Sequence, residues 1–183
     1  MKTQLAFILA IVAAPSFADS LSLDLNDDAL RLNYLHSLNQ NYEADVSWIH
    51  VKDLGNTFAG GLNLVQKFNN DLTGKIGGKA IFQQHDHLPD GTAIAVGGIL
   101  RVTPAANKDI AVSASAYFAP NVLSFGDMDN YREFEIRGEY RVSPQLTAYV
   151  GYRNNRADYK HHSTEVNGVK LYDGAMIGGE FHF

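Results

Sequence analysis

Long stretches of this sequence alternate between apolar and polar residues, and this period of two restricts the fold more than any other feature. Residues 72–83 place Leu72, Ile76 and Phe82 on one face and Lys75 and Lys79 on the other. Successive side chains of a β-strand point to opposite faces, so the pattern predicts strands. It recurs over 58–68, 94–102, 110–118, 134–142, 146–152 and 175–183. We find no comparable helical stretch and predict an all-β chain.

The alternating segments are long for strands of a soluble protein. The strands predicted from these segments are about 10–13 residues long, whereas globular strands are usually about 5–6 residues long and a tilted transmembrane strand needs about 9–11. The predicted connections alternate between short turns and longer polar loops, as in outer-membrane barrels. The turns are 69–71, 104–108 and 143–145, and the loops are 86–91, 119–129 and 154–170.

Aromatic residues gather near the ends of the predicted strands, which fits the two interfacial girdles of a membrane barrel. They are Tyr42, Trp48, Phe58, Phe68, Phe82, Phe118, Tyr140, Tyr152, Phe181 and Phe183.

Three further segments, 20–25, 29–36 and 42–51, bring the predicted number of strands to ten. Bacterial outer-membrane barrels have even strand numbers, which ten satisfies. The alternative of eight requires two segments to lie outside the wall. The predicted fold is therefore a transmembrane antiparallel up-and-down β-barrel of ten strands, with eight as the alternative.

Residues 1–18 differ from the rest of the chain and have the order of parts of a secretory signal peptide. Lys2 supplies a positive charge, residues 5–14 are continuously apolar, and Ser16-Phe17-Ala18 forms a small-x-small cleavage site. The apolar run is shorter than the about 20 residues of a membrane-spanning helix. We expect cleavage after Ala18, a barrel over 19–183, and a location in the outer membrane of a Gram-negative bacterium.

The charge balance excludes some function classes. Lys2 is the only charged residue of the predicted signal peptide, so its removal leaves 14 Lys and Arg against 20 Asp and Glu. An acidic chain is not expected to bind nucleic acid. The chain has no cysteine, so disulfides cannot stabilise it.

If the apolar faces contact lipid, the alternate residues face the lumen. The acids predicted there are Asp24, Glu43, Asp45, Glu133, Glu135, Glu139 and Glu180, and the bases are Arg31, Lys67, Lys75, Lys79, Arg101, Arg137, Arg141 and Arg153. Unpaired ions in a narrow barrel would be costly, so this near-balance predicts paired charges that fill the lumen. We expect a plugged or very narrow lumen.

Several short motifs occur in order along the chain. They are Ser20–Leu25, Gly74–Lys79, Ala95–Gly98, Ser113–Pro120, Tyr131-Arg132, Val150–Arg153 and Gly178–Phe183. With these motifs the chain resembles the YfaZ family of outer-membrane proteins over essentially its whole mature length. The resemblance implies an outer-membrane location and a barrel fold, and it brings no established activity and no catalytic residues.

The final strand is also similar to the general outer-membrane assembly signal, with Gly178, Phe181 and Phe183 at its characteristic spacing. This resemblance implies recognition by the barrel-assembly machinery. The other expected partners are outer-membrane lipid and lipopolysaccharide, and the barrel is expected to be a monomer.

One fragment has an enzyme-like arrangement. His161 and Ser163 would share a face of an extended segment, and a His that polarises a Ser can start acyl transfer. The arrangement is similar to the His-x-Ser of outer-membrane lipid A deacylases. Glu165 is too close in sequence to be assumed as the acid that orients the His. A polar surface loop is the simpler interpretation.

A metal site is a second hypothesis. His85 and His87 would lie on one side of an extended loop, where His161 and His162 could meet them. Zinc sites need three or four converging ligands, and a sequence cannot show convergence. We therefore predict no cofactor.

Three classes of function stay open. The first is a structural or accessory barrel, or a narrow porin. The second is a lipid A-modifying acyl hydrolase that uses His161 and Ser163. The third is a barrel whose loops at 119–129 and 154–170 bind a ligand or partner.

Overall fold

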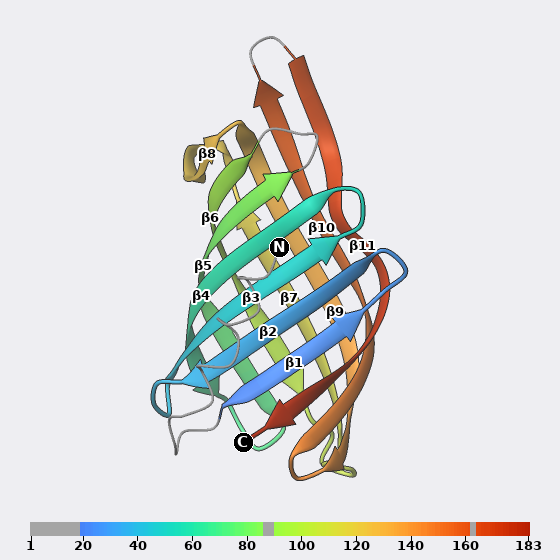
Figure 1. The fold of residues 1–183 in the computed structure, drawn as a ribbon. Helices are drawn as coiled ribbons and strands as arrows, with labels where there is room; N and C mark the ends of the chain where they lie inside the picture. Colours follow the sequence, from blue (N-terminus) through green and yellow to red (C-terminus); the bar gives the residue numbers. More distant parts are fainter. Residues whose placement is uncertain (1–18, 86–89, 162–163) are drawn as a thin grey trace.

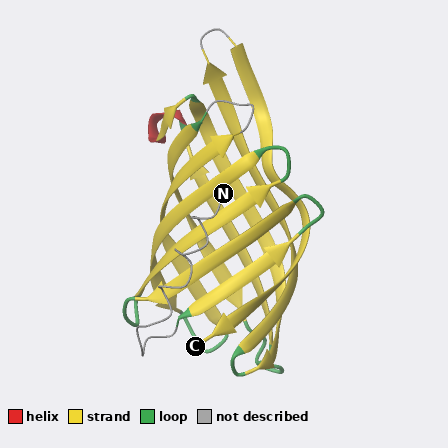
Figure 2. Ribbon diagram, viewed as in Figure 1, coloured by secondary structure: helices red, strands yellow, loops and turns green. Residues whose placement is uncertain are grey.

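The computed structural model describes residues 19–85, 90–161 and 164–183 and consists almost entirely of strands (Figures 1 and 2). The strands are β1 (Ser20–Leu25), β2 (Ala29–Ser37), β3 (Tyr42–Val51), β4 (Gly55–Lys67), β5 (Leu72–His85), β6 (Gly91–Val102), β7 (Ile110–Ala119), β8 (Ser124–Gly126), β9 (Met128–Ser143), β10 (Leu146–His161) and β11 (Thr164–His182). A 3-10 helix (Asn121–Leu123) precedes β8.

The sheet closes on itself. Each long strand pairs antiparallel with its neighbours in the chain, β7 pairs with β9, and β1 pairs with β11 from Ser20↔His182 to Leu25↔Ile177. The short β8 lies outside this ring and pairs only with β6 at Gly91–Ala93. The ring therefore has ten strands, which confirms the predicted barrel and excludes the alternative of eight. Closure pairs every long strand on both sides and leaves no open edge.

The outer surface of the barrel is a belt of exposed apolar side chains. Ile76 is 68% exposed, Val150 60% and Ile177 64%. Such a continuous apolar surface is unfavourable in water and suits contact with lipid. Among the residues of the described ranges, no helix is long and apolar enough to cross a membrane.

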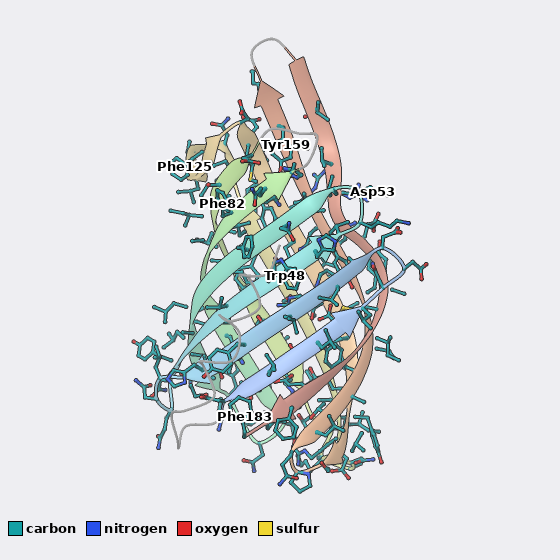
Figure 3. The ribbon with its side chains drawn as sticks, viewed as in Figure 1. Trp48, Asp53, Phe82, Phe125, Tyr159 and Phe183 are labelled. Atoms are coloured by element: carbon teal, nitrogen blue, oxygen red, sulfur yellow. The ribbon has the colours of Figure 1, made fainter. Side chains whose placement is uncertain are left out.

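Aromatic side chains border this belt. Trp48, Phe58 and Phe82 are paired across β3, β4 and β5. Phe58 and Phe82 are exposed on the outer face, and Figure 3 shows Trp48 and Phe82. Tyr42 and Phe181 lie nearer the opposite end, where residues 19 and 183 pair. The two groups match the predicted girdles at the membrane interfaces.

The prediction of a long loop over 154–170 is wrong. The strands β10 and β11 continue through this region as a tall hairpin, with register shifts after Asn155 and Ala157 (Figure 1). Inward residues still alternate here, since Asn155, Ala157 and Tyr159 are buried. Beyond the lipid belt, outward residues no longer need to be apolar, so the period-two pattern of hydrophobicity disappears although the strand continues.

The other connections follow the prediction in part. The turns between residues 67 and 72, 102 and 110, and 143 and 146 lie at one end of the barrel, as expected. At the opposite end, residues 26–28 and 52–54 also form short turns, so the rim is low beside β1–β4 and high beside β10 and β11 (Figure 1). The predicted signal peptide and its cleavage after Ala18 fall on residues 1–18, which lie outside the described ranges.

Candidate functional site in the barrel lumen

A cavity of about 920 Å³ occupies one half of the lumen. This half lies at the end of the barrel with the turns between residues 67 and 72, 102 and 110, and 143 and 146. Asp109 and Pro144 line it at the turn end, and Lys79 and Glu133 line its deepest part. Seven Lys and Arg and seven Asp and Glu side chains line this cavity, so it is close to neutral. A polar cavity that reaches one end of the barrel can hold water and small polar solutes.

Ion pairs cross this cavity between strands that are not neighbours in the sheet. Lys75 of β5 pairs with Glu43 of β3. Arg101 Nε of β6 donates to Glu139 Oε2 of β9 at 2.8 Å. On the other side, Arg137 Nη2 lies 3.6 Å from Glu180 Oε2 of β11. These pairs brace the wall from the inside and neutralise charges in the low-dielectric interior.

The deepest layer of the cavity is closed by Lys79 of β5 and Glu133 of β9. Lys79 Nζ donates to Glu133 Oε1 at 2.8 Å across the lumen and lies 3.9 Å from the centre of the Tyr117 ring. Tyr131 Oη donates to the other carboxylate oxygen of Glu133 at 2.7 Å. Tyr117 Oη in turn donates to Asn63 of β4 at 2.8 Å.

Beside this layer, Arg153 joins β10 to β1 and β9. The side chain is 1% exposed, and its Nη1 donates to Asp24 Oδ1 at 2.8 Å. Its Nε and Nη2 donate to Glu135 Oε2 at 2.8 and 2.5 Å. The guanidinium also lies 4.8 Å from the Tyr172 ring centre. We call Asp24, Glu135 and Arg153 the buried triad.

Above the charged layers, the lumen is filled by an apolar plug. The plug consists of the buried residues Ile81, Ala93, Ala95, Tyr117, Ala119, Met128, Tyr131, Ala157, Tyr159 and Leu171. Tyr159 reaches from β10 to β5 and donates a hydrogen bond to Gln83 (Figure 3). None of the ten lines the cavity, so the cavity ends below them and does not continue to the far end of the barrel.

Inward glycines make room for these large side chains. A Cβ on Gly97 would lie 2.0 Å from the Ala116 carbonyl oxygen and 2.8 Å from the Tyr117 ring. Gly77 is paired with Gly97 on the next strand, and its Cβ would lie 2.5 Å from Asn63 Oδ1. Gly77 and Gly97 thus leave the space that the Tyr117–Asn63 contact needs.

The predicted lumen charges are found as follows. Nine of the ten main candidates line the cavity: Lys75, Lys79, Arg101, Glu133, Glu135, Arg137, Glu139, Arg141 and Glu180. Arg153 lies deeper, in the buried triad. Sequence analysis missed the inward tyrosines Tyr117, Tyr131, Tyr149, Tyr159 and Tyr172. For Tyr117 and Tyr149 the available signal was their inward position in the alternating segments 110–118 and 146–152.

The structure does not support the hypotheses of a His161–Ser163 hydrolase or of a metal site at His85 and His87. Ser163 and His87 lie outside the described residues, and His161 is described only as the last residue of β10. His85 packs edge-on against the Tyr159 ring at 5.2 Å. Within the described ranges, no group of three His, Cys, Asp or Glu side chains could hold a metal ion.

The residues of the predicted assembly signal occupy the two faces of β11. Phe181 and Phe183 are exposed on the outside, and Gly178 faces inward. A Cβ on Gly178 would lie 2.4 Å from the Tyr149 ring, so this glycine has a packing role. Recognition by the assembly machinery stays a prediction.

A closed antiparallel barrel with an apolar belt, aromatic girdles and a charged interior defines an outer-membrane β-barrel protein. The sequence model of one family, described as YfaZ precursor, matches residues 1–183. The chain therefore belongs to the YfaZ family, which confirms the resemblance, and it is an exported outer-membrane protein.

Three solved structures with the same fold are named as porins. A KdgM porin has a TM-score of 0.50 and 11% identity, with 91% of this chain and 99% of that chain covered. A KdgM porin in complex with disordered oligogalacturonate has a TM-score of 0.52 and 13% identity, with the same coverage. A NanC porin has a TM-score of 0.50 and 12% identity, with 90% and 99% covered. A comparison with curated protein sequences gave no match. The acyl-hydrolase alternative is not supported.

Proposed function

We propose that this protein is a narrow outer-membrane channel for small polar solutes and that the apolar plug closes it in the conformation described here. The observation that carries the proposal is the charge-lined cavity, which reaches one end of the barrel and ends below the plug. A barrel with a purely structural role does not need a polar cavity, since side chains can fill ten strands throughout. The fold shared with the KdgM and NanC porins supports the same reading.

The lining of the cavity indicates the kind of solute. Its seven acids and seven bases balance, and many are already paired. A lining of this kind has little net field to attract one sign of ion. We therefore expect small neutral or zwitterionic solutes, and only weak selectivity between cations and anions.

Single-channel recordings in planar bilayers test the proposal. The wild-type protein is expected to show rare, small openings because the plug blocks the lumen. A double variant, Met128→Ala with Tyr159→Ala, removes two plug side chains and is expected to open more often and to a larger conductance. Tyr152→Ala is the control for the tyrosine truncation, since it removes a tyrosine side chain from the lipid-facing side of β10.

Two results would contradict the proposal. Steady nanosiemens-scale steps from the wild-type protein would mean that the lumen is not plugged. A double variant that folds, shown by its heat-dependent gel mobility, yet stays silent would mean that the cavity is not part of a conducting path. The barrel would then have a structural or accessory role.

A further inference from the structure

Three basic side chains lie in one row across the outside of β9, β10 and β11. Arg132 is directly opposite Arg156 in the sheet, and Arg156 is directly opposite Lys170. Like charges that face each other on neighbouring strands destabilise a sheet. We call these three residues the cationic row.

Protein groups neutralise the row only in part. Asp173 is the one acid within ion-pair distance of it in the described ranges, with Lys170 Nζ at 2.9 Å and Arg156 Nη2 at 3.6 Å. The longer distance is beyond a hydrogen bond. Arg156 Nε also has no hydrogen-bond partner, and Arg132 forms no ion pair with a described residue. Lys170 and Arg156 therefore share one acid, and Arg132 has no acid within ion-pair distance among the described residues.

The row lies on the polar side of the aromatic girdle. Arg132 is two residues beyond Phe134 on the outer face of β9, and Arg156 is four residues beyond Tyr152 on β10. At about 3.3 Å per residue, this places the row at the depth of lipid headgroups. The tall end of the barrel, opposite the short turns, corresponds to the external face.

The wall below the row also suits a lipid. An open groove lies there, lined by Leu25, Val150, Ala175 and Ile177, with Asn26 and Asp27 at its edge and the Gly151 and Met176 positions behind it. Val150 and Ile177 are 60% and 64% exposed, so they would contact a chain that lies in the groove. The groove therefore shares β10 and β11 with the row above it.

We infer that the cationic row binds the phosphorylated headgroup of lipopolysaccharide in the outer leaflet, with an acyl chain in the groove below. Arginine binds phosphate oxygens through two parallel hydrogen bonds. Together with Asp173 the three cations have a net charge of +2, which is comparable in size with the charge of about −1.5 to −2 on a phosphate. A bound phosphate would also remove the repulsion within the row. This site is independent of whether the lumen conducts.

Native mass spectrometry of the detergent-solubilised barrel with lipid A tests the inference. The triple variant Arg132→Gln, Arg156→Gln and Lys170→Gln is expected to lower the affinity for bisphosphorylated lipid A at least tenfold. Lipid A treated with phosphatase is expected to bind the wild type as weakly as intact lipid A binds this variant. The control variant Lys52→Gln with Lys108→Gln removes positive charge away from the row and the lumen and is expected to bind like the wild type.

Asp173→Asn provides a variant of the opposite sign. It removes the acid that competes for Lys170 and Arg156, so lipid A is expected to bind about threefold more tightly. A misfolded variant could not produce such a gain.

Three outcomes would overturn the inference. The first is equal binding of the wild type and the triple variant. The second is displacement of lipid A by inorganic phosphate at millimolar concentration, which would make the row a site for free phosphate. The third is unchanged or weaker binding by Asp173→Asn.

Discussion

Replacement of Arg153 by Met would test the buried triad most directly. Met has a similar length and no charge, so it leaves the two carboxylates of Asp24 and Glu135 in place without their shared partner. Asp24 is 0% exposed, so water cannot replace its lost hydrogen bonds, whereas Glu135 is 9% exposed and also lines the cavity.

The structure sets the size of the effect. Removal of one member of a buried ion pair costs about 3–5 kcal/mol, because the remaining charge stays buried without compensation. Here Asp24 keeps Arg31 at 3.5 Å and Glu135 keeps Arg137 at 3.9 Å. Both are beyond hydrogen-bond distance but still attract, so we expect the lower end, about 3 kcal/mol.

Urea unfolding in phospholipid vesicles would measure this loss. Trp48 is the only tryptophan and lies in the outer girdle, so its fluorescence reports withdrawal of the barrel from lipid. Heat-dependent gel mobility provides a second measure of folding. The matched variant combines Arg153→Met with Asp24→Asn and Glu135→Gln, which removes all three charges together.

The test compares the free energy of unfolding of Arg153→Met with that of the triple variant. We expect the triple variant to be more stable than Arg153→Met alone by about 2 kcal/mol, because no uncompensated carboxylate is left in the interior. A loss below about 1 kcal/mol for Arg153→Met, or a triple variant less stable than the single one, would refute the reasoning.

Two further predictions concern the inner and outer faces of the wall. Gly97→Ala places a methyl group against the β7 backbone, so we expect the free energy of unfolding to fall by about 1–3 kcal/mol. Gly138→Ala, with no atom within 4 Å of its Cβ, should change little, and equal losses in the same urea assay would contradict the packing argument. Ile76→Lys puts a charge in the middle of the lipid-facing belt and is expected to cost about 2–4 kcal/mol. Val122→Lys, in the 3-10 helix, is the control, and an equal effect of both would argue against the assigned membrane position.

The strands and their lipid-facing side chains could be predicted from the sequence. Alternation is a local property, since neighbouring residues of a strand must point to opposite faces. It therefore predicted ten strands, the belt around Ile76, and the girdle residues Trp48 and Phe82 without any knowledge of which strands pair. It failed at 154–170, because hydrophobic alternation is needed only where one face contacts lipid.

The contents of the lumen depended on the tertiary structure. The alternation along each strand predicted that Lys79, Glu133 and Arg153 point inward. It did not predict that Lys79 of β5 meets Glu133 of β9 although β6 and β7 lie between these strands in the ring. Barrel closure and the stagger of the strands decide which side chains meet across the lumen. Neither can be predicted from the residues of a single strand. For the same reason, only the closed barrel shows that charged side chains line one half of the lumen while tyrosines and small apolar residues plug the other. It is also the pairing of β9, β10 and β11 that brings Arg132, Arg156 and Lys170 into one row.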